Sequence, residues 1–212
     1  MKQFLIFFIV VMLVDIANAQ KIKDEELKFA RAGFKGGINY SFVTGDLENT
    51  GGRTRAHFGV LVEYPVFDQF YVQGELFYSA QGYTMEVENQ TQEIGMNYIA
   101  LPVLAKYYIK NSFAIEAGLQ VANLSTFGNE DLPDNDPFYD SFNNFDFGAV
   151  VGIGYYLESG LFFQARYYSG LRDFNNTSIE AKNQMAQVSL GYLFKTKDNR
   201  RIFNEETQDA DQ

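Results

Sequence analysis

The sequence of 212 residues contains no cysteine and no tryptophan, and it has one histidine and four prolines. Without cysteine there can be no disulfide, no thiolate zinc site and no cysteine nucleophile. Positive charge is also scarce, with 17 Lys and Arg against 27 Asp and Glu and a formal net charge of −10. A nucleic-acid-binding surface needs clustered Lys and Arg to neutralise phosphates, so no nucleic-acid partner is expected.

The chain also lacks an apolar run long enough for a membrane-spanning helix, which needs about 20 residues. The longest run, Phe4 to Val14, follows Lys2 and precedes the small-residue sequence Ala17-Asn18-Ala19. A positive start, a short apolar stretch and an A-x-A sequence are typical of a secretory signal peptide. The sequence therefore predicts a signal peptide at residues 1–19, cleaved after Ala19, and a protein that leaves the cytoplasm.

What the chain does contain is alternation with a period of two. In the stretch from Phe145 to Leu171, large apolar residues alternate with small or polar ones on both sides of a turn at Leu157–Gly160. This period is typical of β-strands, whose successive side chains point to opposite faces. The same pattern predicts eight strands, at about residues 31–43, 56–64, 70–83, 97–109, 113–121, 145–156, 161–171 and 185–194.

The connections between these strands alternate in length. Those after the first, third, fifth and seventh strands are predicted to be long and polar, and those after the second, fourth and sixth to be tight. This rhythm is expected of an antiparallel barrel with outer loops at one end and short periplasmic turns at the other. We therefore predict an all-β fold, an eight-stranded antiparallel up-and-down transmembrane β-barrel at residues 31–194. A periplasmic lead-in at residues 20–30 and a disordered polar tail at 195–212 complete the predicted organisation.

The polar face of the strands indicates which side meets lipid. A soluble barrel with an apolar interior would carry many Lys and Glu residues outside, whereas here the polar face is mostly Gly, Ser, Asn, Gln and Ala. Small residues suit the crowded interior of a narrow barrel. The apolar face carries tyrosines near strand ends, as an interfacial aromatic girdle would; they are Tyr40, Tyr64, Tyr107, Tyr155 and Tyr192. This pattern favours a barrel in the bacterial outer membrane, with the apolar face in lipid.

Three segments carry a resemblance to a known family: GFKGGINYS from Gly33, YIALPVLAKYY from Tyr98 and SLGYLF ending at Phe194. With them, the chain resembles the small outer-membrane β-barrel proteins of Bacteroidetes, the PorT-like or "porin family" group, over about residues 33–194. The resemblance implies the barrel fold but no particular activity. Such barrels commonly end near a terminal aromatic residue, whereas here the chain continues after Phe194.

Six charged residues are predicted to point into the barrel at similar depth, in the periplasmic half of their strands; they are Lys35, Glu63, Glu75, Lys106, Glu116 and Arg166. Because an unpaired buried charge is costly, three acids and three bases predict a salt-bridged plug. Two alternatives stay open, a polar channel lining and a general acid–base pair formed by Glu75 and Glu116. Asp146 and His57 are further inward candidates, and no sequence motif supplies His57 with a catalytic triad.

The predicted fifth connection is acidic, with Glu130, Asp131, Asp134, Asp136 and Asp140. These residues lack the spacing of a calcium loop, so they predict a solvated acidic face rather than a metal site. We expect a non-enzymatic monomer without catalytic residues or cofactors, with a structural or adhesive role. Its expected partners are outer-membrane lipid, lipopolysaccharide, and surface or periplasmic proteins. The alternative roles are a narrow porin-like channel and a component of a secretion or gliding machine.

Overall fold

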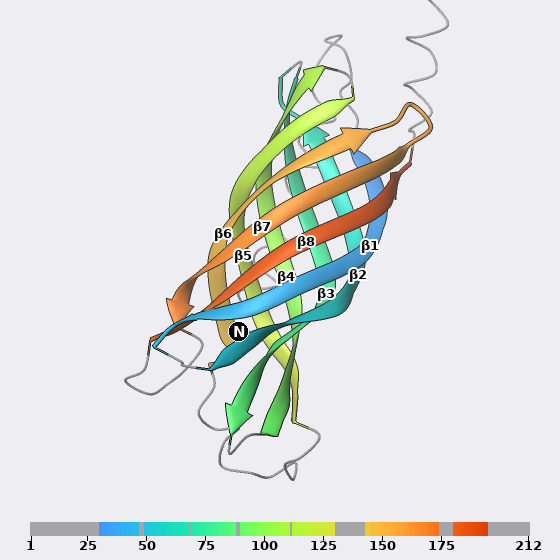
Figure 1. Ribbon diagram of the computed structural model, residues 1–212. Helices are drawn as coiled ribbons and strands as arrows, with labels where there is room; N and C mark the ends of the chain where they lie inside the picture. The colour runs from blue at the N-terminus through green and yellow to red at the C-terminus, as the bar shows by residue number, and fades with distance from the viewer. Residues whose placement is uncertain are drawn as a thin grey trace, which may run out of the picture.

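The computed structural model describes residues 30–46, 49–67, 69–87, 90–110, 112–129, 143–173 and 180–194. These residues form eight β-strands (Figure 1). Their bounds are β1 Arg31–Gly45, β2 Thr50–Pro65, β3 Phe70–Val87, β4 Gln90–Lys110, β5 Phe113–Asn129, β6 Phe145–Tyr156, β7 Leu161–Asp173 and β8 Ala181–Leu193. The predicted signal peptide at 1–19, residues 20–29 of the lead-in and the tail at 195–212 lie outside the described residues.

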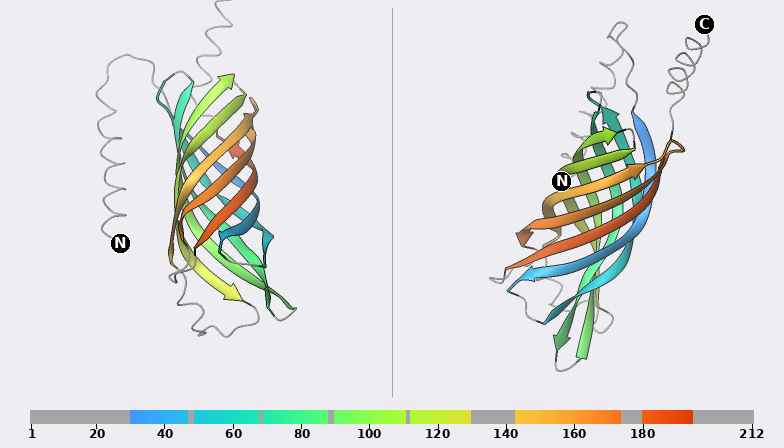
Figure 2. Two further views of the ribbon diagram at one scale, coloured as in Figure 1. Left: turned by 60° about the vertical axis from the view of Figure 1, so that its left-hand side comes forward. Right: turned by 45° about the horizontal axis from the view of Figure 1, so that its top comes forward.

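Each strand pairs antiparallel with the next one in the sequence, and β8 pairs with β1, which closes the sheet into a barrel. The closing register runs from Gly33 opposite Leu193 to Gly45 opposite Ala181. Closure satisfies the backbone hydrogen bonds of both edge strands, a condition that any sheet within a lipid bilayer has to meet. The predicted fold, an eight-stranded up-and-down barrel, is confirmed. The strands run at a marked tilt to the barrel axis (Figure 2).

The two ends of the barrel differ. At one end, here called the turn end, the connections are residues 66–69, 111–112 and 157–160, and β1 begins where β8 ends. At the other end, the loop end, the connections are residues 46–49, 88–89, 130–144 and 174–180. Two of the four connections expected to be long are therefore short. The polar segments 44–55 and 84–95 were predicted as loops, but most of their residues continue the neighbouring strands.

The physical reason for this error is that polar residues can still pair in a ladder. Residues 84–87 of β3 pair with 90–93 of β4, although neither segment carries an apolar face suited to lipid. As a result β3, β4 and β5 have 18, 21 and 17 residues, against 12 and 13 for β6 and β7. About 9–11 residues cross a membrane. The surplus extends beyond the other strands at the loop end, where the green β3–β4 hairpin reaches furthest among the described residues (Figure 1).

We call this extension the projecting sheet: residues 82–87 of β3, 90–97 of β4 and 124–129 of β5. The β3–β4 ladder runs without a register shift to Val87 opposite Gln90. The β4–β5 ladder runs from Asn97 opposite Thr126 to Ile94 opposite Asn129, after a register shift between Asn97 and Tyr98. An apolar cluster that includes Tyr83, Ile94 and Met96 is buried on its inner side. The projecting sheet is thus a packed continuation of the barrel wall.

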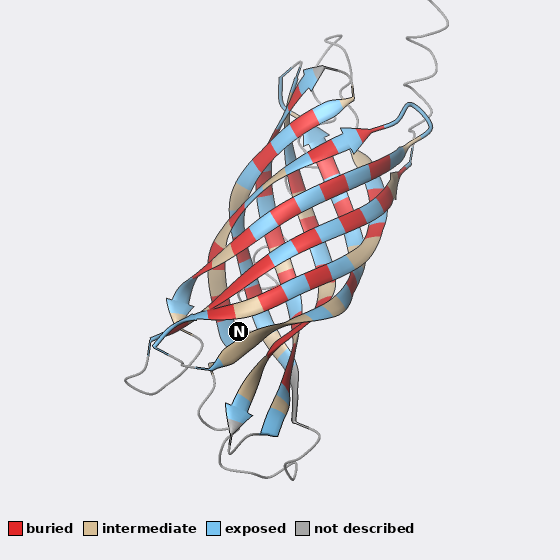
Figure 3. Cartoon of the chain, in the orientation of Figure 1, coloured by how far each residue is buried: buried red, intermediate tan, exposed pale blue. Residues whose placement is uncertain are grey.

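Burial alternates along the strands (Figure 3). The outward side chains form an exposed apolar surface that includes Phe58, Val151 and Val188. Of the five predicted girdle tyrosines, Tyr64, Tyr107, Tyr155 and the half-buried Tyr192 lie near the turn end, whereas Tyr40 lies closer to the loop end. The inward side chains fill the barrel with polar and charged groups between apolar clusters. No helix in the described part of the chain is long and apolar enough to span a membrane.

Pro102 lies inside β4, and neither neighbouring ladder shifts register beside it. The β3–β4 register continues unchanged from Gly74 opposite Val103 to Phe77 opposite Ala100, but the ladder has no pairs between these points. Proline has no backbone N–H to donate, so the ladder is interrupted beside it. Glu75 lies in this interruption, and it is buried in the charged interior of the barrel.

Candidate functional site

The candidate site is the charged interior of the barrel. All six predicted residues (Lys35, Glu63, Glu75, Lys106, Glu116 and Arg166) are buried there. They come from six different strands, β1, β2, β3, β4, β5 and β7. The strand alternation therefore delivers charged side chains from around the whole barrel to the same space.

Arg166 links opposite walls of the barrel. Its Nη1 and Nη2 atoms donate to the two carboxylate oxygens of Glu75 at 2.8 and 2.6 Å. Its Nε donates to Glu116 of β5, which is separated from β7 by β6. Lys35 Nζ forms a second ion pair with Glu75, at 2.7 Å. Two bases and two acids thus form one continuous group in which every charge has an opposite partner.

A second group lies against the aromatic cluster at the turn end. Lys106 Nζ contacts Glu63 Oε2 at 2.7 Å, and Glu63 also forms an ion pair with Arg31. The ammonium group of Lys106 lies 3.9 Å from the ring centroid of Tyr156, in a cation–π contact. Arg31 in turn stacks over Tyr71, with its guanidinium carbon 5.0 Å from the ring centroid.

Two glutamines join the network. Gln73 accepts a hydrogen bond from Lys106 Nζ at 2.8 Å and donates one to Glu75 Oε1 at 2.5 Å, so it connects the two groups. Gln164 accepts from Lys35 at 3.2 Å and donates to Glu116 Oε2 at 3.1 Å. We call the nine residues the ionic network: Arg31, Lys35, Glu63, Gln73, Glu75, Lys106, Glu116, Gln164 and Arg166.

Gly152 makes one of these contacts possible. It lies on β6 directly opposite Glu116 of β5 and directly opposite Arg166 of β7. Because glycine has no side chain, the two charged groups meet across its backbone. A Cβ atom at this position would lie 2.7 Å from Arg166 Cγ and 2.8 Å from Glu116 Oε1.

The arrangement is suited to filling space and not to acid–base chemistry. Arg166 binds both carboxylate oxygens of Glu75, and Lys35 shares one of them. Arg166 and Gln164 bind one oxygen each of Glu116. A general acid or base needs an open approach to its substrate. Burying an ion pair also costs desolvation free energy. The ion pairs here are explained if the interior of the barrel has to be filled with polar side chains.

Between the ionic network and the loop end, the interior is polar, and Asp146 is the buried acid of this region among the described residues. Asn39 donates to Ser79 Oγ at 2.9 Å and accepts from Gln187 at 3.0 Å. His57 is buried, with its Nε2 atom 2.8 Å from Ser189 Oγ, while its Nδ1 atom has no hydrogen-bond partner among the described residues. No acid therefore completes a triad at His57 in that part of the chain.

Asp146 is also buried, closer to the loop end, and accepts a hydrogen bond from Asn183 Nδ2 at 3.5 Å. It belongs to neither charged group of the ionic network. The interior acids Asp146, Glu63, Glu75 and Glu116 are nonetheless equal in number to the four bases of the ionic network, which are Arg31, Lys35, Lys106 and Arg166.

Sequence reasoning missed Arg31, Gln73 and Gln164 as members of the site. Arg31 is the first residue of β1. No strand residue precedes it, so the alternating pattern alone does not show that its side chain points inwards. Gln73 and Gln164 lie two residues from Glu75 and Arg166, so alternation puts them on the same inward face, but nothing in the sequence distinguishes a bridging amide from a space-filling one.

The predicted acidic loop residues Glu130, Asp131, Asp134, Asp136 and Asp140 lie outside the described residues. Within the described ranges, no group of three or more His, Asp or Glu side chains is placed to hold a metal ion.

A closed, eight-stranded barrel with an apolar exterior and a polar, ion-paired interior defines a small transmembrane β-barrel. Residues 18–176 match the family described as "Outer membrane protein beta-barrel domain". The chain therefore belongs to this family, and the protein is located in the bacterial outer membrane. By the rule for such barrels, the turn end faces the periplasm and the loop end faces the outside of the cell.

Solved structures share the fold at low sequence identity. Neisserial surface protein A (NspA) is 11% identical, with 79% of this chain and 100% of that chain covered and a TM-score of 0.53. OprG from Pseudomonas aeruginosa is 17% identical, with 80% and 98% covered and a TM-score of 0.46. Ail of Yersinia pestis, solved with the heparin analogue sucrose octasulfate, is 13% identical, with 78% and 99% covered and a TM-score of 0.44. No curated protein matches the chain.

The first prediction concerns Glu75. The Glu75→Gln substitution leaves Lys35 and Arg166 without their shared counter-charge in a buried position, so it should lower the free energy of unfolding by about 3–5 kcal/mol. The matched control is Glu93→Gln, which breaks the partly exposed pair with Arg53 and should cost less than about 1 kcal/mol. Urea titration of the barrel refolded in lipid vesicles, with the folded fraction read from unboiled gels, measures both. Equal costs would contradict the importance of the ionic network.

The second prediction concerns Gly152. Gly152→Ala places a methyl group against Arg166 and Glu116 and should destabilise the barrel by about 1–3 kcal/mol through overpacking. Gly74→Ala is the control, because a Cβ there meets no atom within 4 Å; it should change stability by less than about 0.5 kcal/mol. The same titration compares the two variants. A neutral Gly152→Ala would show that the pair does not depend on this glycine.

Proposed function

We propose that the protein is a non-enzymatic surface protein: a barrel sealed by its ionic network that anchors the projecting sheet outside the cell for structural or adhesive contacts. The observation that carries the proposal is the unequal length of the strands. Strands β3–β5 are several residues longer than a membrane crossing needs, and the surplus is at the loop end. An ordered sheet held above the membrane is suited to contact other molecules.

The ionic network supports a sealed lumen over a channel. It contains groups from six strands and reaches from β3 to β7 through Arg166. The interior of an eight-stranded barrel is only wide enough for side chains to fill. A conducting pore would need these paired groups to separate, which leaves buried charges without partners.

The same proposal includes the lipid contacts of the barrel, its oligomeric state and its relation to a known group. The exposed apolar surface would contact phospholipid and lipopolysaccharide, and one chain closes its own sheet, so a monomer suffices. The motifs at Gly33, Tyr98 and Phe194 support a place among the PorT-like proteins of Bacteroidetes. A role in a secretion or gliding machine would involve the lead-in and tail, which lie outside the described residues.

The third prediction tests the seal. The wild-type protein in planar bilayers should show no sustained conductance. A triple variant, Glu75→Ala, Glu116→Ala and Arg166→Ala, should give discrete current steps, because it removes three of the four charged side chains of the group around Arg166. Heat-dependent mobility on gels must first show that both proteins are folded. Steady currents from the folded wild type would overturn the sealed barrel and favour the narrow channel.

The fourth prediction tests the projecting sheet as the contact surface. Replacing residues 86–91 with an Asn-Gly turn, which is suited to a two-residue hairpin, shortens the projecting sheet without entering the membrane-spanning part. Attachment of producing cells to one another and to a solid surface should fall severalfold. Unchanged attachment would contradict the adhesive role.

The control for this comparison is equal display at the surface. Because the chain has no cysteine, the exposed Ser125 of β5 can be replaced by cysteine (Ser125→Cys) in both proteins. Labelling of intact cells with a membrane-impermeant maleimide should then be equal, and Ser112→Cys at the turn end should react only after permeabilisation.

A further inference from the structure

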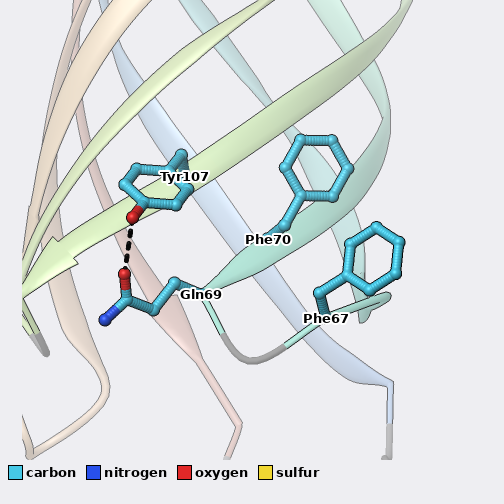
Figure 4. Close-up of a pocket in the computed structure, with 4 residues that line it drawn as sticks. All are labelled: Phe67, Gln69, Phe70 and Tyr107. Atoms are coloured by element: carbon cyan, nitrogen blue, oxygen red, sulfur yellow. Dashed lines mark hydrogen bonds between the residues drawn. The ribbon is translucent and has the colours of Figure 1, made fainter.

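An aromatic pocket lies on the outside of the barrel at the turn end. It is lined by Phe67 and Gln69 of the β2–β3 turn, Phe70 at the start of β3 and Tyr107 of β4 (Figure 4). Phe70 and Tyr107 are direct partners in the β3–β4 register. The turn itself is fixed by backbone hydrogen bonds between Phe67 and Phe70 and by Tyr108 N donating to Gln69 O at 2.9 Å.

The pocket combines a large apolar exposure with one polar group. Phe67 is 67% exposed, and its ring centroid lies 6.1 Å from that of Phe70. An aromatic ring so exposed in a turn is unfavourable in water but favourable in lipid. Nearby outward residues, among them Val72 and Ile109, are exposed as well, so the pocket is continuous with the lipid-facing surface.

The polar group is the side-chain amide of Gln69. Its Oε1 atom accepts a hydrogen bond from the Tyr107 hydroxyl at 2.7 Å. This contact fixes the amide, and the Nε2 atom is on the side away from Tyr107 (Figure 4). An amide nitrogen has two N–H groups. A donor held at the edge of an apolar pocket is suited to a neutral acceptor attached to an apolar chain.

We propose that this pocket is a binding site for one glycerophospholipid of the periplasmic leaflet, with an acyl chain against the three aromatic rings and an ester carbonyl accepting a hydrogen bond from Gln69 Nε2. Among the described residues, the pocket lining includes no Lys or Arg to neutralise a phosphate, so the ester carbonyl fits better than the phosphate group. The turn end faces the periplasm, whereas lipopolysaccharide occupies the opposite leaflet. The site is independent of the adhesive role.

The absence of tryptophan allows a direct test by fluorescence quenching. Val72→Trp places an indole two residues from Phe70 on the same face of β3, close to the pocket but outside its lining. Phe163→Trp is the matched control, since both positions are the third residue of a strand counted from the turn end and both point outwards. Each protein is reconstituted in vesicles of a diether phospholipid, which has no ester carbonyls, and a diester phospholipid with brominated chains is added in increasing fractions.

The expected result is a preference for the diester lipid near the pocket. Quenching at Val72→Trp should indicate about fivefold tighter binding of the diester lipid than of the diether lipid, as one net hydrogen bond would give. Phe163→Trp should show no preference. Adding Gln69→Leu to Val72→Trp should abolish the preference, and adding Gln69→Leu to Phe163→Trp should change nothing.

Two outcomes would overturn the proposal. Identical quenching curves for Val72→Trp and Phe163→Trp would show that the pocket holds lipid no differently from the rest of the surface. A preference that survives Gln69→Leu would exclude the hydrogen bond. Inorganic phosphate added to the vesicles should leave the curves unchanged, and competition by phosphate would show an anion site instead.

Discussion

The structure depends on the pairing of Arg166 with two carboxylates inside the barrel. A barrel in lipid must turn its apolar side chains outwards, so its narrow interior receives what remains, small, polar and charged groups. Charges in such a space are tolerated only with opposite partners. Arg166 neutralises Glu75 on the opposite wall and Glu116 two strands away on β5, and this contact explains why Gly152 lies between Glu116 and Arg166.

The constraint from lipid applies only to the membrane-spanning part of each strand. Beyond it, residues of β3 and β4 are polar on the outside and still pair, because backbone hydrogen bonds do not depend on the side chain. The apolar cluster around Ile94 and Met96 stabilises this extension from within. Within the membrane, the outer side chains of these strands are apolar. Beyond the membrane, the same strands form a packed sheet whose outer side chains are polar.

The strand count, the barrel and the two faces could be predicted from the sequence because a period of two directly reports which side chains share a face. Partner choice could not be predicted in this way. Lys106 lies opposite Glu116 in the β4–β5 register, yet its ion pair is with Glu63 of β2. Such contacts depend on the tilt of the strands and on the reach of side chains across the barrel. The strand ends at the loop end were predicted wrongly for a related reason, since a polar segment such as 84–95 gives no apolar alternation even when it forms a ladder.

These constraints separate the parts of the protein that can carry specificity. The charged side chains of the ionic network neutralise one another, so replacing any of them should lower the free energy of unfolding. The lipid-facing surface is mostly uniform in chemistry, with the amide of Gln69 among aromatic rings as a local exception. The projecting sheet meets neither requirement, because its outer side chains do not contact lipid and it does not have to fill the barrel interior with neutralised charges. Selection on recognition can therefore act there without cost to the barrel, which is the physical argument for a surface role over a transport role.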